Sequence, residues 1–281
     1  MFNKKAIDRI RGYISGDGYL NTCSMKRKSY EFDDFFELYT MYGDKFFGKV
    51  LYEKILIDAE VLMSAIYDKM GVKTPMYLPF MQRREMGVVS ESVDAFDSTA
   101  KTIAQIQDKQ GAHIYNQFYI RNLISNPDMQ KMLTKNAIND IVTMTNLDIA
   151  SRNTDRSSFN LFLGDKQADG RFNSGISIDY GSCADRYAKF RHGLDDYYIN
   201  IGKVGRGRYQ YIAQMCAIED WYGFVTPKEF ITKLDGINVR EIAREIRETY
   251  GYEIDSRYIN YVQDSYRDFI ETTNDFLNFN G

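Results

Sequence analysis

Three side chains of the sequence have the types and spacing that phosphoryl transfer requires. Asn160 follows Asp155 by five positions, and Asp179 comes after a further segment rich in turn-forming residues. Transfer of a phosphoryl group to a hydroxyl needs one carboxylate to orient and deprotonate that hydroxyl. A second carboxylate, together with an amide oxygen, can hold Mg²⁺ against the nucleotide phosphates. We therefore predict that Asp155, Asn160 and Asp179 form one site.

The elements around these residues favour their coming together. Two short β-rich runs, at residues 160–164 (NLFLG) and 175–181 (GISIDYG), flank a turn-like segment at residues 165–174. A hairpin of this kind would bring Asp179 back to the side of Asn160. An Asp-x-Gly triplet is also a common turn, so the alternative interpretation is a solvent-exposed turn at Asp179.

The first ninety residues are predicted to form the order β, β, α, β, β. Residues 35–52 contain two β-rich runs on either side of a turn at residues 42–45. In residues 53–70 apolar side chains recur every three or four positions, as in an amphipathic helix, and Gly71 stands where such a helix ends. Residues 72–89 return to a strand-like pattern.

The second part of the chain is mainly helical in pattern. Residues 128–149 and 256–279 are the clearest predicted helices, and Pro127 suits the opening of the first of them. We expect an α+β protein with a small β-rich N-lobe at residues 1–90 and a larger helical C-lobe at residues 91–281.

Composition narrows the class of protein. The chain has 36 Lys and Arg against 39 Asp and Glu, so it lacks the basic excess of a duplex-binding protein, and we predict no direct nucleic-acid contact. The basic run at residues 26–28 is interpreted as a solvated turn. Cys23, Cys183 and Cys216 are too far apart for a disulfide framework or a zinc site. Neither a membrane span nor a signal peptide is recognisable, so we expect no membrane contact and a cytoplasmic location.

A known family resembles this chain in several segments. The run NTDRSSFN at residues 153–160 closely resembles the catalytic loop of HipA-like serine/threonine kinases, whose pattern is Asn-x-Asp-Arg-His-x-x-Asn. ISIDYGS at residues 176–182 is similar to their metal-binding Asp segment. Residues 58–80 and 87–92 (GVVSES) resemble that family's helix, strand and hinge region, and ISG at residues 14–16 resembles the start of its glycine-containing loop.

The resemblance covers most of residues 12–185 and implies a bilobal protein-kinase-like fold that binds ATP and Mg²⁺ between its lobes. It implies that Asp155 is the catalytic carboxylate and that Asn160 and Asp179 are the Mg²⁺ ligands. Lys49, near the end of the strand KFFGKV, would bridge the nucleotide phosphates. Glu60, on the following helix, would pair with Lys49 and hold it in place.

Further nucleotide contacts follow from the same resemblance. They would come from the glycine-containing loop and the hinge, at Ser15, Gly16, Gly18 and Glu91. Simple turn roles are the alternative for the two glycines, because a lone Gly-x-Gly is a weak signal. Lys45 is the rival of Lys49 as the phosphate ligand. Glu53 is the rival of Glu60 on the same predicted helix.

We therefore expect an ATP- and Mg²⁺-dependent kinase that transfers the γ-phosphoryl group to a Ser or Thr hydroxyl of a protein, with an antitoxin-type protein as a further partner. Ser157 stands where the family usually has His, which favours as an alternative a pseudokinase that binds ATP without consuming it. Phosphatidylinositol-type lipid kinases share the Asp-Arg-x-x-x-Asn arrangement, so a lipid or small-molecule kinase is another alternative. The chain begins almost directly with the kinase-like part, and we expect the extra N-terminal domain of longer HipA toxins to be absent.

Overall fold

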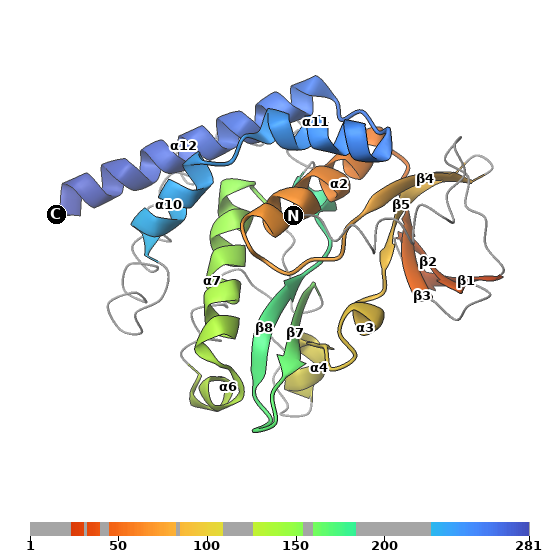
Figure 1. Cartoon of the computed structure of the whole chain (residues 1–281), viewed down its shortest axis with the longest axis horizontal. Coiled ribbons are helices and arrows are strands. Elements are labelled where there is room, and N and C mark those ends of the chain that lie inside the picture. The colour runs from red at the N-terminus through yellow and green to blue at the C-terminus, as the bar shows by residue number, and fades with distance from the viewer. Residues whose placement is uncertain are drawn as a thin grey trace.

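A five-stranded antiparallel sheet forms one end of the molecule, and helices form most of the rest (Figure 1). The computed structural model describes residues 24–30, 33–39, 45–82, 85–108, 126–153, 160–183 and 226–280. The α+β prediction, with a β-rich part followed by a mainly helical part, is confirmed.

The N-terminal sheet has the strand order β1-β2-β3-β5-β4, and every neighbouring pair is antiparallel. Its strands are β1 (Ser24–Tyr30), β2 (Asp33–Tyr39), β3 (Lys45–Val50), β4 (Leu78–Gln82) and β5 (Glu85–Glu91). The predicted order β, β, α, β, β is confirmed for β2, β3, the following helix, β4 and β5.

Strand β1 corrects one prediction. Residues 26–28 lie within this strand and pair with β2, so the interpretation of the basic run as a turn was wrong. Residues 24–30 carry few apolar residues, and their own pattern gives little strand signal. Strand β2 decides the conformation instead, because its edge offers backbone partners for every residue of β1.

Helix α2 (Lys54–Lys69) connects the sheet to the rest of the molecule. Its limits agree with the predicted residues 53–70, and Gly71 follows it with a φ of +86°, a left-handed conformation that glycine adopts at little cost. The helix is buried continuously from Ile57 to Tyr67, polar residues included. A helix buried on all sides packs against two layers at once. It lies between the N-terminal sheet and the remaining helices (Figure 1).

A second sheet contains β6 (Lys101–Thr102), β7 (Leu161–Lys166) and β8 (Phe172–Ser177). Helix α7 (Lys135–Ala150) packs on β8, and the short helices α3 (Val93–Phe96) and α4 (Ile103–Asp108) lead from the first sheet to this one.

The single helix expected at residues 128–149 is two helices, α6 (Pro127–Met132) and α7, so that expectation was wrong in this detail. Two hydrogen bonds of Thr134 explain the break. The Thr134 side chain accepts the Ala137 N–H as an N-cap, while the Thr134 N–H donates to Phe172 of β8. Pro127 does open α6, as expected.

Three helices complete the described chain: α10 (Pro227–Asp235), α11 (Val239–Tyr250) and α12 (Ser256–Asn280). α11 packs on α2, and α10 packs on α12. The helix expected at residues 256–279 is thereby confirmed. One large apolar cluster joins α2, α7 and these helices, whereas a smaller one lies within the N-terminal sheet.

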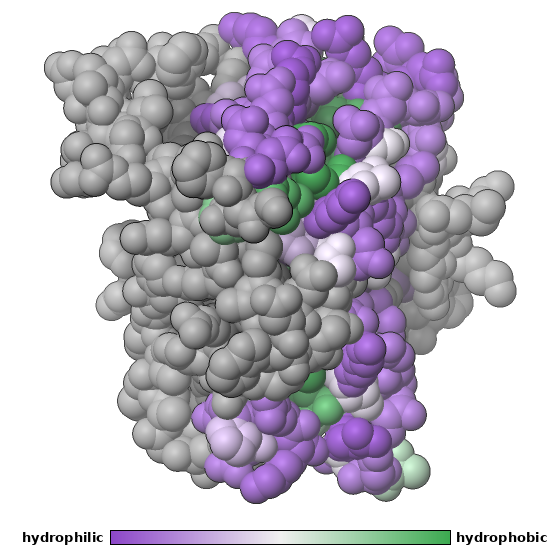
Figure 2. Space-filling model, turned by 90° about the vertical axis from the view of Figure 1, so that its left-hand side faces the viewer, coloured by the Kyte–Doolittle hydropathy of each residue, from purple (hydrophilic) through white to green (hydrophobic). Residues whose placement is uncertain are grey.

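The described surface in Figure 2 is largely hydrophilic, with apolar residues visible in small areas. No helix in the described ranges has the length and apolar character that crossing a bilayer would demand.

Candidate active site

The alternation of strand β3 sets the direction of Lys49. Phe46, Gly48 and Val50 are buried, whereas Lys49 lies on the other face of the strand. Packing explains the glycine at position 48, because a Cβ there would lie 2.1 Å from ring atoms of Phe36. The small apolar cluster therefore occupies one face of the sheet, and Lys49 projects from the opposite face.

The structure brings Lys49, Glu60 and Asp179 together from three separate segments of the chain. The Lys49 Nζ lies 3.0 Å from Asp179 Oδ1 and 3.7 Å from Glu60 Oε1. It also lies 5.7 Å from the ring centroid of Phe35, which is its cross-strand neighbour on β2. One cation is thus shared between two carboxyl groups beside an aromatic ring.

The two rival residues lie elsewhere. The Lys45 Nζ contacts Glu37 at 3.2 Å and Asp94 at 3.0 Å. Glu53 is exposed and occupies the N-cap position of α2. Glu60, two turns further along the helix, is the glutamate that reaches Lys49.

Glu60 is fully buried, and this changes its acid–base behaviour. Burial raises the pKa of the Glu60 carboxyl to about 8, and the nearby Asp179 charge adds to the rise. The Lys49 charge and the Tyr180 N–H, which donates to Glu60 Oε2 at 2.9 Å, oppose it. Glu60 Oε1 has no hydrogen-bond partner in the described part of the chain. One buried carboxyl oxygen of the cluster is therefore left without a hydrogen bond from the described residues.

Asp179 has a backbone φ of +62°, a left-handed conformation that costs a non-glycine residue about 1 kcal/mol. The next residue holds it there. Tyr180 is buried, its N–H is bonded to Glu60, and its hydroxyl donates to Thr74 Oγ1 at 2.8 Å. Residues kept in strained conformations are concentrated at functional sites.

The glycine of the Asp-Tyr-Gly run borders the same cluster. A Cβ on Gly181 would lie 3.5 Å from Glu60 Oε1, and 3.9 Å from both Asp179 Oδ1 and Lys49 Nζ. The absence of a side chain at Gly181 leaves this volume beside the charged groups unfilled.

The hairpin of β7 and β8 was predicted from the sequence and is confirmed. Asn160 directly precedes β7, and Asp179 lies two residues after the end of β8, so both are at the open end of the hairpin. The Ile178 N–H donates to the Asn160 carbonyl at 3.2 Å, so the backbone at Asn160 lies next to the residue preceding Asp179.

Glu91 does not join the cluster. It ends strand β5 opposite Phe46, whereas Val88 is opposite Lys49. Residues three apart on a strand face opposite sides, so the Glu91 side chain lies on the other face of the sheet from Lys49. Four further predicted residues lie outside the described ranges: Asp155, Ser15, Gly16 and Gly18.

Sequence reasoning missed Phe35 and Tyr180. Tyr180 had a weak signal, since an aromatic residue directly after Asp179 and before a glycine suggests a buried anchor. Phe35 had none, because its position beside Lys49 depends on the register between β2 and β3.

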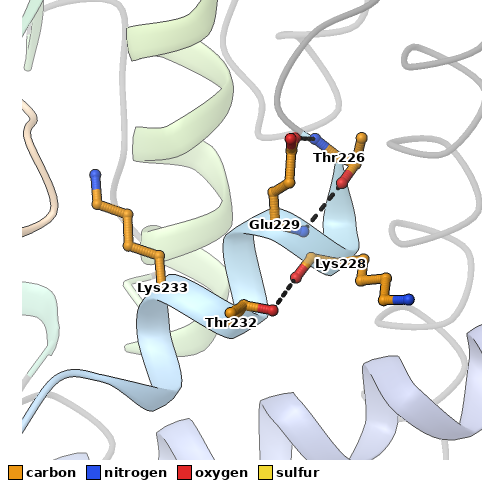
Figure 3. A pocket seen from close by; sticks show the side chains of 5 residues that line it. All are labelled: Thr226, Lys228, Glu229, Thr232 and Lys233. Atoms are coloured by element: carbon orange, nitrogen blue, oxygen red, sulfur yellow. Dashed lines mark hydrogen bonds between the residues drawn. The ribbon is translucent and has the colours of Figure 1, made fainter.

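A separate pocket of about 420 Å³ lies at the N-terminus of α10 (Figure 3). Its lining residues are Thr226, Lys228, Glu229, Thr232 and Lys233. Their polar atoms already serve the helix: Thr226 and Glu229 form a reciprocal capping box, and the Thr232 hydroxyl donates to the Lys228 carbonyl. The Lys233 Nζ donates to the Met70 carbonyl. These bonds occupy Thr226, Glu229, Thr232 and Lys233 within the fold.

A lysine on the third strand of an antiparallel sheet, a glutamate on the next helix and an aspartate after a later hairpin are the arrangement of protein kinases. The fold is therefore bilobal and protein-kinase-like.

Comparison with solved structures finds kinases. The chain is similar to the proinflammatory kinase CtkA of Helicobacter pylori at 15% identity, covering 90% of this chain and 91% of that one with a TM-score of 0.42. It is similar to HipA of Shewanella oneidensis, solved with HipB and operator DNA, at 13% identity. That match covers 99% of this chain and 71% of HipA, with a TM-score of 0.45. It is similar to the Rio2 kinase of Chaetomium thermophilum at 13% identity. That match covers 95% of this chain and 75% of Rio2, with a TM-score of 0.40. No protein-family model and no curated protein sequence matches the chain.

Proposed function

We propose that the protein is an ATP- and Mg²⁺-dependent kinase of the HipA-like type, which transfers the γ-phosphoryl group to a Ser or Thr hydroxyl of a protein. The observation that carries the proposal is the cluster of Lys49, Glu60 and Asp179. A partly buried cation, held by a buried carboxyl group beside a strained aspartate, suits the phosphates of a nucleotide and their metal ion.

The residues present fit Mg²⁺. Asp179 would supply a carboxylate and Asn160 an amide oxygen, and Gly181 places no side chain beside Asp179, where a Cβ would lie 3.9 Å from its Oδ1. Mg²⁺ usually takes one or two carboxylate ligands and completes its shell with water and substrate phosphates. When bound, it would neutralise phosphate charge.

The chain's own residues account for the other parts of the reaction. Lys49 would bind the phosphates, and Glu60 would hold Lys49 in place through the contact of its Oε1 with the Lys49 Nζ. Asp155 would orient the acceptor hydroxyl and take its proton. The hydroxyl oxygen then forms a bond to the γ-phosphorus, the bond from that phosphorus to the β-phosphate oxygen breaks, and ADP leaves.

Residues outside the charged cluster would also contact the nucleotide. Ser15, Gly16 and Gly18 would cover the phosphates. Glu91 ends β5, before the proposed hinge. Because its side chain lies on the opposite face from Lys49, the proposal assigns the contact with the base to its main chain.

The proposal is tested by intact mass after incubation with ATP and Mg²⁺. Wild type, Asp155→Asn and Asp179→Asn should be compared side by side. We expect added phosphoryl groups on wild type alone. Equal phosphorylation of either variant would overturn the assignment of these residues.

A second candidate is a pseudokinase that binds ATP without consuming it, and Ser157 favours it. Tight ATP binding by wild type with no ADP formed, against any protein or lipid acceptor, would establish this alternative. Restoration of turnover by Ser157→His would instead mark a weakened enzyme. The resemblance of residues 153–160 also supports an antitoxin-type partner, which would be found as a stable complex of defined stoichiometry.

A further inference from the structure

A buried carboxylate at the end of α7 lies outside the charged cluster. Asp148 is 3% exposed. Its Oδ1 accepts the Tyr67 hydroxyl at 2.6 Å and the Asn153 Nδ2 at 2.8 Å. The Asn153 N–H also donates to the Asp148 carbonyl at 2.7 Å. Asp148 is therefore bonded to α2 on one side and to the chain leaving α7 on the other.

Asn153 is the first residue of the run at 153–160 that includes Asp155. The chain turns just before it, because Arg152 has a φ of +58° and ends the helical path. The Arg152 side chain pairs with Asp268 of α12 at 3.3 Å. The two bonds from Asn153 to Asp148 hold Asn153, the residue at which this run begins.

Helix α2 relates this point to the charged cluster. Glu60 and Tyr67 are seven residues apart, which is two helical turns, so they share one face about 10 Å apart along the axis. Glu60 accepts the Tyr180 N–H, and the Tyr67 ring lies 4.7 Å from the Tyr180 ring. One face of α2 therefore contacts the Asp179 segment and also Asp148, which in turn holds Asn153.

We propose that Asp148 is a positioning residue for phosphoryl transfer, which fixes the run carrying Asp155 relative to Lys49 and Asp179. The inference rests on the proposed kinase function. Its chemistry suits the role, since the Tyr67 hydroxyl and the Asn153 amide both donate and a carboxylate only accepts. Low exposure strengthens such bonds and makes their loss costly.

Two single variants test the link with little change in shape. Tyr67→Phe removes one donor and keeps the ring, and Asn153→Ala removes the other. We expect each to lower the rate of ADP formation at saturating ATP about tenfold, with the KM for ATP within about twofold of wild type. The double variant should lose less than the product of the two single losses, because both bonds serve one purpose.

Two further variants serve as controls. Tyr266→Phe removes another buried tyrosyl hydroxyl, one without a hydrogen-bond partner among the described residues, and should leave turnover unchanged. Asp148→Asn keeps one acceptor oxygen and should retain turnover within about threefold. Turnover of Tyr67→Phe and Asn153→Ala equal to that of Tyr266→Phe would overturn the inference. So would a rise in KM without a fall in kcat.

A second measurement separates this inference from the function on which it rests. Amide hydrogen exchange at Asn153 should accelerate in Tyr67→Phe and stay as in wild type in Tyr266→Phe. If wild type binds ATP and Mg²⁺ but forms no ADP, the proposed function fails, whatever the exchange shows. If wild type is active and exchange at Asn153 does not change, the kinase assignment stands and the positioning role of Asp148 is wrong.

Discussion

One face of helix α2 contacts two polar regions whose hydrogen bonds are satisfied to different degrees. In the first, Glu60 and Asp179 both contact the Lys49 Nζ, and Glu60 Oε1 has no hydrogen-bond partner in the described ranges. In the second, the Asp148 Oδ1 receives two donors at short distances. The first region thus contains a buried acceptor without a hydrogen bond from the described residues, whereas the second contains a buried acceptor that two donors bond.

This difference indicates what each region is suited to do. Unbalanced charge and backbone strain cost folding free energy and are kept where a ligand completes the site. Matched buried hydrogen bonds hold groups in one arrangement and have little capacity for a ligand. The charged cluster is thus the part suited to bind, and the Asp148 network is the part suited to position.

The largest effect is expected from the lysine of the charged cluster. Lys49→Met should lower phosphoryl transfer about 10³-fold or more, because the proposed contact between the Lys49 charge and the nucleotide phosphates is lost. Lys45→Met is the matched control on the same strand, since Lys45 pairs with Glu37 and Asp94 instead. Rates of ADP formation compare the two. Equal losses would show that the strand, rather than the Lys49 charge, matters.

The next effect concerns Glu60. Glu60→Gln should lower transfer about 10- to 100-fold, because Lys49 loses a carboxyl partner that can take a negative charge when the site requires it. Glu53→Gln, on the exposed end of the same helix, should leave the rate unchanged. ADP formation at saturating ATP measures both. Unchanged turnover in Glu60→Gln would remove Glu60 from the proposed site.

Glu60 also gives a pH dependence of stability. Its folded pKa of about 8 lies above the ordinary value, so the folded state keeps this proton longer than the unfolded state does. Its contribution is therefore favourable at low pH and is lost as the pH rises toward 8. In urea unfolding, the free energy of unfolding of Glu60→Gln should exceed that of wild type by an amount that grows from pH 5 to pH 8. A gain independent of pH would contradict the raised pKa.

The smallest effect is expected from Asp140, a partly buried carboxyl group that accepts a single hydrogen bond from the described residues. Asp140 of α7 accepts only the Gly175 N–H, at 3.0 Å, among the bonds of the described residues. Burial raises its pKa to about 6. Its ionised form opposes folding above that pH, so Asp140→Asn should stabilise the protein at pH 8 by about 1 kcal/mol.

The gain from Asp140→Asn should shrink as the pH falls below 6, because the wild-type carboxyl then takes up its proton in the folded state. Urea unfolding at pH 5 and pH 8 measures the difference. Transfer should be unaffected, since Asp140 contacts β8 and not the charged cluster. Destabilisation at pH 8 would show that its charge is stabilising after all.

Much of the fold was predictable because its signals are local. The period of residues 53–70, with Gly71 after them, predicts α2 nearly to the residue. Pro127 indicates the start of α6, but the break at Thr134 depends on its bond to Phe172, which no local pattern shows. Strand β1 was missed for the same reason, since its pairing with β2 supplies what its own sequence lacks.

The candidate site, too, has a part that local sequence patterns predict and a part that depends on tertiary contacts. The sequence by itself determined which residue types are present at kinase-like spacing, and that Asp179 follows a hairpin after Asn160. Only the tertiary structure decided that Lys49 and Glu60, rather than Lys45 and Glu53, meet Asp179. It alone placed Tyr67 and Asn153 on one oxygen of Asp148. Local backbone preference is carried by neighbouring residues, whereas contacts between distant segments are chosen by strand register and by the packing of a buried helix.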